Sequence, residues 1–408
     1  MQAGTAETQR PAATFTGAAL VANAAELGRE LAKGAIQRDH DRILPIAEAR
    51  RLRALGIQTA RVPKRYGGPE ARFVEFAQIM MHLGEGDPNL AQMLQPHFVL
   101  MDWLAIDGSE AQRRRYYGDV MKGAIISNAF AERAGKTPGD FRSLLSRHGA
   151  GYRLNGTKFY ATGSMIADQL YVLCRLEDGA HVVAIMPANR HGIEIIDDWD
   201  GMGQRTTGSG TVKLVDVEVA EDEVMRLSVF DKVRSYLGAA SQISHAAIDA
   251  GIALAALHDG VEYGRTKARP VAESGVERAS DDPYVMQAVG EMAVMAHAAE
   301  ASVLRGARIL DEVMAERERL TGEALDRAYA RASIAVAEAK AAANDASIRV
   351  GEMLFRVAGA SATLRKYGLD RHWRNARTHT THDPVAYKYR AIGDYMLNDR
   401  LPPISTKI

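Results

Sequence analysis

Residues 155–168 read Asn-Gly-Thr-Lys-Phe-Tyr-Ala-Thr-Gly-Ser-Met-Ile-Ala-Asp, and this stretch lies inside a segment with the texture of a β-sheet. Asn155-Gly156 is the strongest short signal for a hairpin turn, so we expect strands on both sides of it. Apolar runs at 170–173 and 181–186 flank Asp178-Gly179 and predict two further strands. The pattern therefore indicates a compact central β domain.

The segments on either side of the β domain have helical periodicity. Before it, Ile46, Leu52 and Leu55 share one face, and a second helix is expected over residues 73–83. After it, residues 235–356 are rich in alanine with apolar residues at helical spacing, which predicts long helices packed as a bundle. The predicted organisation is a disordered segment 1–18, an N-terminal helical domain 19–128, a central β domain 129–230 and a C-terminal helical bundle 231–408.

Composition narrows the class of protein. The 51 Lys and Arg residues balance the 51 Asp and Glu residues, so no net charge favours nucleic acid or an anionic membrane as a partner. Cys174 is the single cysteine, which excludes internal disulfides and a cysteine-built metal cluster and fits a reducing compartment. The first residues lack the pattern of a signal peptide, and no run approaches the ~18 apolar residues of a spanning helix. We expect a cytoplasmic protein.

Several tempting motifs do not support a nucleotide or metal site. Residues 151–158 have the glycine spacing of a phosphate loop, but Thr157 stands where the lysine is needed. Gly201-Met-Gly203 lacks the third glycine of a dinucleotide fingerprint. Residues 377–384 contain His379, His382 and Asp383, and three interpretations stay open: a capped turn, a catalytic loop or a metal site. No third convergent ligand is identifiable, so we predict no metal.

Three phrases in the right order resemble the acyl-CoA dehydrogenase superfamily. They are the stretch 155–168 quoted above, residues 203–214 (Gly-Gln-Arg-Thr-Thr-Gly-Ser-Gly-Thr-Val-Lys-Leu) and residues 370–377 (Asp-Arg-His-Trp-Arg-Asn-Ala-Arg). The resemblance covers about residues 25–400. It implies an α+β fold with an N-terminal helical domain, a central β-barrel-like domain and a C-terminal four-helix bundle.

Two departures from the dehydrogenase pattern bear on the chemistry. The Glu that is commonly the α-proton base in that family falls, in a gapless reading, on Asp383, followed by Pro384. A shorter carboxylate on a stiffer turn is a poor base, because a base must reach within about 3 Å of its proton. The family's Arg-x-x-Phe-Gly phrase for the adenine half of FAD is absent at residues 267–270, which favours the smaller FMN.

The variant phrases resemble one branch of the superfamily. Residues 274–283 and 373–384 are similar to the two-component FMN monooxygenases of the dibenzothiophene monooxygenase and sulfur-acquisition oxidoreductase type. This resemblance implies a homotetramer and reduced FMN supplied by a separate NAD(P)H-dependent flavin reductase. It also implies that dioxygen adds at flavin C4a, and that the hydroperoxide oxygenates a small organosulfur compound: a sulfide, sulfoxide, sulfinate or thiophene.

The same resemblance assigns roles to individual residues. The cofactor-binding residues it implies are Asn128, Tyr160, Ser164, Trp199, Arg278 and His379. Arg278 is expected to meet the FMN phosphate from a neighbouring subunit, because a guanidinium suits a phosphate. The catalytic residues it implies are His97, His382 and Ser164, with Ser164 near flavin N5 and the histidines holding or returning a proton.

Other interpretations of these residues and of the whole chain stay open. Arg278 could instead form a surface ion pair with Asp281 or Asp282, and Trp199 could be a core anchor of the β domain. The protein could be an FAD-dependent acyl-CoA dehydrogenase, a flavin monooxygenase that hydroxylates nitrogen, or a scaffold that kept the fold and lost flavin.

Overall fold

The computed structural model describes residues 15–133 and 141–408, and its N-terminal part is helical, as predicted. Thr16 caps the first helix by accepting a hydrogen bond from the N–H of Ala19, and Ser109 caps the fifth helix through Gln112. The prediction of disorder over residues 1–18 falls mostly outside the described residues, and the first helix begins at Gly17. The helices are α1 (Gly17–Asp41), α2 (Ile46–Ala54), α3 (Phe73–Gly86), α4 (Pro88–Asp107) and α5 (Glu110–Met121).

The central β unit is a single eight-stranded mixed sheet with the strand order β6-β7-β3-β2-β4-β5-β8, and β1 pairs with β4. The predicted turn at Asp178-Gly179 is confirmed, because it joins the antiparallel strands β4 and β5. The strands are β1 (Ile126–Ala129), β2 (Leu144–His148), β3 (Gly151–Lys158), β4 (Gln169–Leu176), β5 (His181–Pro187), β6 (Ile193–Ile196), β7 (Thr211–Val219) and β8 (Val224–Arg226).

The prediction of a hairpin turn at Asn155-Gly156 is wrong. Both residues lie inside β3, and the turn between β2 and β3 is at residues 149–150. Asn155-Gly156 marks an irregularity instead, because the register with β7 shifts between Leu154 and Gly156. The Asn155 side chain accepts a hydrogen bond from the N–H of Asp216 on that strand. The flexible backbone of Asn155-Gly156 therefore permits a β-bulge within a strand, where we predicted a turn between two strands.

The C-terminal part contains three long helices and two shorter ones. They are α6 (Leu237–Thr266), α7 (Pro283–Glu316), α8 (Gly322–Ala358), α9 (Asp370–Thr380) and α10 (Ala386–Asn398). Most of α6 is buried, and it packs against α3, α4, α7, α8 and α9. Its small residues allow close contact: a Cβ at Gly251 would lie 2.4 Å from the carbonyl oxygen of Met81 on α3. The central position of α6 explains its nearly continuous apolar sequence.

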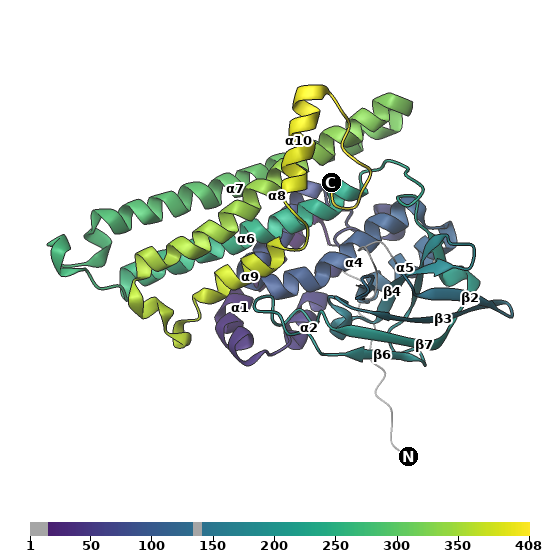
Figure 1. The fold of residues 1–408 in the computed structure, drawn as a ribbon, viewed down its shortest axis with the longest axis horizontal. Coiled ribbons are helices and arrows are strands. Elements are labelled where there is room, and N and C mark those ends of the chain that lie inside the picture. The colour runs from purple at the N-terminus through teal and green to yellow at the C-terminus, as the bar shows by residue number, and fades with distance from the viewer. Residues whose placement is uncertain (1–14, 134–140) are drawn as a thin grey trace, which may run out of the picture.

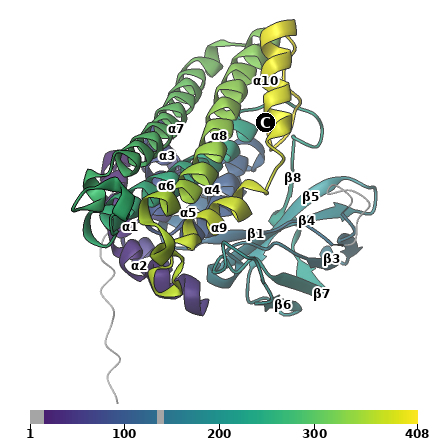
Figure 2. The same cartoon turned by 60° about the vertical axis from the view of Figure 1, so that its left-hand side comes forward.

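The long helices form one side of the molecule and the sheet forms the other (Figure 1). Helix α4 lies between them, and β1 packs against it. Helix α10 stands against α8 and projects away from the sheet (Figure 2). The turn between α9 and α10 lies where the helical side meets α4, so residues of this turn face the centre of the molecule. No helix in the described residues is long and apolar enough to cross a membrane.

Candidate active site

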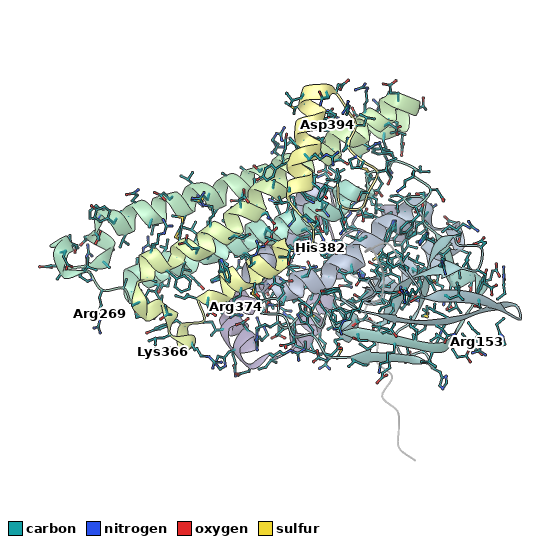
Figure 3. All side chains as sticks on the ribbon, viewed as in Figure 1. Arg153, Arg269, Lys366, Arg374, His382 and Asp394 are labelled. Carbon is teal, nitrogen blue, oxygen red and sulfur yellow. The ribbon has the colours of Figure 1, made fainter. Side chains whose placement is uncertain are left out.

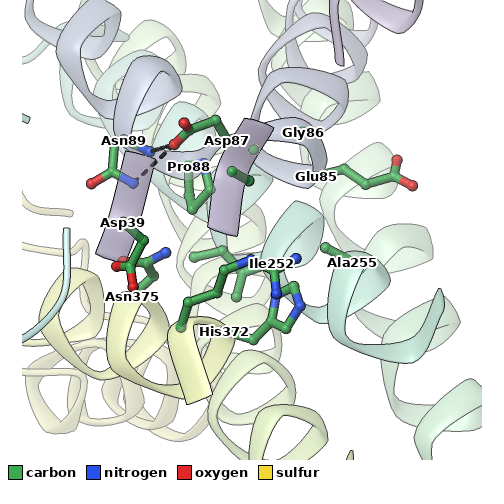
Figure 4. Close-up of a pocket in the computed structure, with 13 residues that line it drawn as sticks. Asp39, Glu85, Gly86, Asp87, Pro88, Asn89, Ile252, Ala255, His372 and Asn375 are labelled. Atoms are coloured by element: carbon green, nitrogen blue, oxygen red, sulfur yellow. Dashed lines mark hydrogen bonds between the residues drawn. The ribbon is translucent and has the colours of Figure 1, made fainter. Parts of the chain in front are cut away.

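The first turns of α4 connect the loop after β6 to the C-terminal helices. Asp87 caps α4 by accepting a hydrogen bond from the N–H of Asn89 at 2.9 Å. The Asn89 side chain accepts one from the N–H of Thr206 at 3.1 Å, and Asn375 of α9 accepts one from the N–H of Gln204 at 2.6 Å. Asp87, Asn89 and Asn375 line a narrow crevice among α1, α4, α6 and α9 (Figure 4). The loop at 199–207 is thereby fixed from two sides.

A second loop, residues 160–164, presses against the same helix. Gly163 has φ +79°, and a Cβ there would lie 2.3 Å from the carbonyl oxygen of Met93 on α4. Only glycine fits such a contact in this conformation. Tyr160 also has a positive φ, +55°, which is strained for an aromatic residue. Strain of this kind is typical of functional loops, and here it sets the position of Ser164.

Two buried polar atoms near this loop have no partner among the described residues. They are Oγ of Ser164, whose residue is 2% exposed, and Oδ1 of Asn128 at the end of β1. An unpaired polar atom in a protein interior costs about 1–3 kcal/mol, so such atoms indicate a ligand. These are the positions that the resemblance assigns to the flavin face. A flavin ring edge offers the donors and acceptors that both atoms lack, so the residues fit this group.

Tyr160 and Trp199 contact each other across the two loops. Their ring centroids are 5.8 Å apart in an edge-to-face arrangement. Nε1 of Trp199 donates a hydrogen bond to the carbonyl oxygen of Gln204 at 2.8 Å, which fixes the indole. The Tyr160 side chain is left largely uncovered, with 54% of the residue exposed. The pair forms an aromatic surface beside the orphan Ser164 hydroxyl.

His379 lies at the centre of a buried polar network between α4, α6 and α8. Its Nδ1 lies 2.6 Å from Oδ1 of Asp249, and Asp249 forms an ion pair with Lys340. Its Nε2 lies 3.1 Å from Nδ1 of His245 and 3.0 Å from Oε1 of Gln92. Burial of Asp249 opposes ionisation, but Lys340 and His379 outweigh it and lower the pKa of this carboxyl group. Direct contact of His379 with a cofactor stays a prediction.

His382 lies at the start of the turn between α9 and α10 (Figure 3). Its side chain is 47% exposed, and its Nδ1 is hydrogen-bonded to Asp383. The imidazole also packs on His245, with ring centroids 4.4 Å apart. Asp383 is buried and forms an ion pair with Lys388 of α10 at 2.5 Å. His382 therefore has a carboxylate behind one ring nitrogen and solvent access at the ring, the arrangement of an oriented proton-transfer group.

His97 is fully buried on α4, and both ring nitrogens are bonded to main chain. Nε2 donates to the carbonyl oxygen of Gln58 at 2.8 Å, and Nδ1 accepts from the N–H of Ile126 at 3.1 Å. Burial lowers the pKa of His97 to about 4, so the ring is neutral at pH 7. A catalytic role for His97 stays a prediction. The geometry favours a structural one, since neither nitrogen is left for a ligand.

Arg278 is placed at the surface of the chain. It forms a two-pronged ion pair with Asp281, with both contacts at 2.9 Å, and its side chain is 74% exposed. This is the alternative that the sequence left open, and a role at the FMN phosphate stays a prediction. An exposed ion pair contributes little to stability, so Arg278 can leave Asp281 for a phosphate at small cost.

The sequence analysis missed the buried residues that surround His379, His382 and Asp383. They are His245, Asp249, Lys340, Lys388 and Gln92. A signal was present, because His245 and Asp249 stand one turn apart in residues 245–257 of α6, which are otherwise apolar. Two ionisable groups on the same face of a buried helix must be paired with groups on a neighbouring element. Within the described residues, no group of three or more His, Cys, Asp or Glu side chains is arranged to hold a metal ion.

Comparison with known proteins identifies the family of this chain. Family models for the N-terminal and C-terminal domains of acyl-CoA dehydrogenase match residues 18–124 and 243–386. The dibenzothiophene monooxygenase of Rhodococcus qingshengii is 32% identical over 94% of both chains. The probable FMNH2-dependent monooxygenase SfnC of Pseudomonas putida is 28% identical over 94% of this chain and 95% of its own.

The solved structures give the same result. FMN-bound TdsC from Paenibacillus sp. A11-2 superposes with a TM-score of 0.88 at 31% identity, over 95% of this chain and 100% of its own. The predicted fold is therefore confirmed, from the helical N-terminal part through the central sheet to the C-terminal helices. The chain belongs to the acyl-CoA dehydrogenase family, in the branch that contains the dibenzothiophene monooxygenases.

Proposed function

We propose that this protein is the oxygenating component of a two-component flavin monooxygenase, which uses reduced FMN and dioxygen to oxygenate a small organosulfur compound. Its similarity over nearly the whole chain to dibenzothiophene monooxygenase, SfnC and FMN-bound TdsC supports this function. The structural observation that supports it is the pairing of Asp383, the residue on which the dehydrogenase base falls in a gapless reading of the sequence. Bound reduced FMN supplies the electrons and the ring carbon that reacts with dioxygen.

Asp383 is unsuited to remove a proton from an acyl-CoA. Burial opposes its ionisation, but the hydrogen bond from His382 and the charges around it hold its pKa well below the ordinary range. One of its oxygens accepts from His382 and the other from Lys388. A carboxylate that is so paired is a weak base and has no oxygen aimed at a substrate. This observation opposes the alternative of an FAD-dependent acyl-CoA dehydrogenase.

His382 is the group that we propose handles the proton of the reaction. Asp383 can only accept, so Nδ1 of His382 carries the hydrogen of that bond, and Nε2 has no hydrogen-bond partner in residues 15–133 and 141–408. An imidazole that is held through Nδ1 can accept a proton at Nε2 and return it. The oxygenation needs such a group, because hydrogen peroxide is lost when protons and water reach the reacting oxygen without control.

The flavin ring is proposed to lie between the two loops and α4. Oγ of Ser164 and Oδ1 of Asn128 would bond its polar edge, and the Tyr160–Trp199 pair would cover the ring. Arg278 of a neighbouring subunit would hold the phosphate. His379 is proposed to act on this site through its contact with His245.

The partners that we propose are an NAD(P)H-dependent flavin reductase and three further copies of this chain, in the cytoplasm. Apolar side chains remain exposed on the outer helices: Tyr284, Met286 and Val294 on α7, and Tyr387, Met396 and Leu397 on α10. Exposed apolar surface on outer helices is typical of contacts between subunits. Light scattering tests the tetramer, and Leu397→Glu with Met396→Glu should shift it towards smaller species.

An oxygen-uptake screen with chemically reduced FMN tests the function. The compounds are sulfides, sulfoxides, sulfinates, thiophenes and amines, and product is measured against hydrogen peroxide. At least one sulfur compound should raise oxygen uptake and yield a product that is heavier by one oxygen atom. Oxygenation of amines alone would transfer the activity to nitrogen. Bleaching of bound FAD by an acyl-CoA, with no oxygenated product, would overturn the proposal.

A further inference from the structure

Lys340, Asp249, His379 and His245 form a continuous buried row from α8 through α6 to α9. Lys340 pairs with Oδ2 of Asp249, and Oδ1 of the same carboxylate faces Nδ1 of His379. Nε2 of His379 faces Nδ1 of His245 at 3.1 Å. All four residues are at most 3% exposed. Stability alone does not explain a buried ion pair such as Lys340–Asp249, because a protein with an apolar pair of similar volume in its place is often as stable.

The hydrogen-bond directions in this row follow from the charge of Asp249. A carboxylate only accepts, so Nδ1 of His379 carries a hydrogen, and Nε2 of the neutral ring is an acceptor, to which the Gln92 amide must turn its NH2 group instead of Oε1. Nδ1 of His245 then donates to it. Burial lowers the pKa of His379 against the pull of Asp249, and burial with the two neighbouring histidines lowers the pKa of His245. Both rings are therefore neutral at rest, in one fixed tautomer each.

Every neighbouring element contributes to this charge balance. Helix α8 presents Lys340, α6 presents Asp249 and His245, and α4 presents the neutral Gln92. The turn after α9 presents His382 with its partner Asp383, whose charge is balanced by Lys388 of α10. With neutral imidazoles, the Lys340 and Asp249 charges cancel. One added proton can then be stabilised by the Asp249 carboxylate, as an imidazolium at His379.

We propose that Asp249, held ionised by Lys340, is a positioning residue that makes His245 and His379 a buried proton-holding pair for the reaction. This inference rests on the proposed function. A proton that reaches Nε2 of His245 releases the Nδ1 hydrogen of that ring to Nε2 of His379. The charge then rests on His379 beside Asp249, and the reverse movement returns the proton. Two N–H bonds form, at Nε2 of His245 and at Nε2 of His379, and one breaks, at Nδ1 of His245; the difference is the one proton that entered, and no electrons are transferred.

The protein contains a matched control for this chemistry. Asp259, also on α6 but further along by roughly 15 Å, binds His372 at 2.8 Å and Arg371 at 2.7 Å. Like Asp249, it pairs with one histidine and one basic side chain, which is an arginine here and a lysine there. His372 has no second imidazole bonded to it among the described residues, and Asp259 is partly exposed. Asp259→Asn should therefore report only the structural cost of breaking a His–Asp contact.

The first experiment compares product yield per oxygen consumed from pH 6 to pH 9. The variants are Asp249→Asn, Asp249→Asn with Lys340→Met, and the control Asp259→Asn. The double variant removes both buried charges and should fold and bind FMN like the wild type. It should nevertheless release about 10-fold more hydrogen peroxide per product, and the pH at which yield falls by half should move by about one unit. The control should keep the wild-type pH profile. A double variant with the wild-type yield and profile would overturn the proposal.

The second experiment does not depend on oxygenation. Flavin-free protein with 15N-labelled histidine should show His379 protonated at Nδ1 and bare at Nε2 at pH 7, assigned by comparison with His379→Gln. The Asp249→Asn, Lys340→Met variant should show a mixture of tautomers, and Asp259→Asn should leave the His379 signals unchanged. A mixture in the wild type refutes the positioning role. If no substrate is oxygenated but the single tautomer is present, the proposed function fails while the assignment of Asp249 stands.

Discussion

Nζ of Lys388 lies 2.5 Å from Oδ2 of Asp383, and both side chains are only 2% exposed. The ammonium also donates to the carbonyl oxygen of Lys407 at 2.9 Å, so α10 and the C-terminal segment meet at this pair. Burial lowers the pKa of Lys388, while Asp383 opposes that change. The two charges therefore depend on each other, and the turn that carries His382 depends on both.

Removing one member of this pair should destabilise the protein more than removing both. Lys388→Met leaves Asp383 as an uncompensated buried charge, which costs about 3–5 kcal/mol. The double variant Lys388→Met, Asp383→Asn should recover most of that loss, because neither remaining side chain is charged. Urea unfolding followed by circular dichroism measures both values. Equal destabilisation in the single and double variants would show that the pair has no net coupling.

His382→Ala should leave FMN binding intact and uncouple oxygen use from product formation. The change removes the imidazole whose Nε2 has no hydrogen-bond partner among the described residues, and loss of one proton-transfer group typically lowers a rate by about 10²–10⁴-fold. Oxygen uptake should continue while hydrogen peroxide replaces product. His191→Ala, at an exposed histidine of the β-sheet side, is the control and should change neither quantity.

Two variants of the turn between α9 and α10, His382→Ala and Asp383→Asn, distinguish a monooxygenase from a dehydrogenase. A monooxygenase should tolerate Asp383→Asn better than His382→Ala, since an amide oxygen can still accept from Nδ1 of His382. A dehydrogenase would show the opposite order with an acyl-CoA substrate. Asp383→Asn is made together with Lys388→Met so that no ammonium is left unpaired, and His382→Ala is made in the wild-type protein, where Lys388 still pairs with Asp383. If Asp383→Asn proves the more damaging change for oxygenation, our assignment of the proton to His382 is wrong.

The order of the N-terminal helices, the central sheet and the C-terminal helices could be predicted from sequence, because apolar residues recur at a helical spacing in the outer segments and in a strand pattern in the central one. The apolar runs around Asp178-Gly179 gave β4 and β5 correctly. The Asn155-Gly156 signal failed, because the same backbone freedom serves a turn and a bulge, and only the pairing with β7 decides between them. Local sequence therefore located the irregular position but not its geometry.

The site was predictable only where its residues are neighbours in the chain. Ser164 and His382 stand in recognisable phrases, and the structure places a buried orphan hydroxyl and an oriented imidazole there. Lys340 stands in an alanine-rich helix and contacts a residue 91 positions away. No local pattern links it to Asp249. Long-range pairs between buried charges become visible only once the helices are packed.

The preference of the protein for FMN should depend on contacts with the FMN phosphate and not on contacts with the flavin ring. We expect Arg278 to leave Asp281 and to bind the phosphate of FMN that is held in a neighbouring subunit. Arg278→Ala should then lower the affinity for reduced FMN by about 10- to 100-fold. Riboflavin, which has no phosphate, should bind both proteins equally. Anaerobic titration measures the affinities, with Arg269→Ala as a control at another arginine that precedes α7. Equal losses for FMN and riboflavin would make Arg278 structural. Reduced FAD should bind more weakly than reduced FMN.

A final prediction concerns an ion pair that joins α3 and α6 outside the active site. Nδ1 of His258 lies 2.8 Å from Oε1 of Glu85. Burial opposes the ionisation of Glu85, but hydrogen bonds from His258 and His82 outweigh it and lower its pKa to about 2. The hydrogen bond to Glu85 raises the pKa of His258, against the effect of burial. The pKa of Glu85 is lowered and that of His258 is raised, so the two side chains attract each other as opposite charges over a limited range of pH.

The Glu85 contribution is present above the ordinary glutamate pKa of about 4.5 and is lost as pH falls towards 2. The His258 contribution is complete below about pH 6.5 and is lost as pH rises through its raised value. His258→Ala should therefore lower the melting temperature most between about pH 4.5 and 6.5, and least above pH 8.5. Because the imidazole is largely exposed, the loss should be at most about 1 kcal/mol. His297→Ala, at an exposed histidine on α7, should show no such maximum. Calorimetry from pH 4 to pH 9 measures the difference, and a pH-independent loss would mean that His258 contributes packing and not charge.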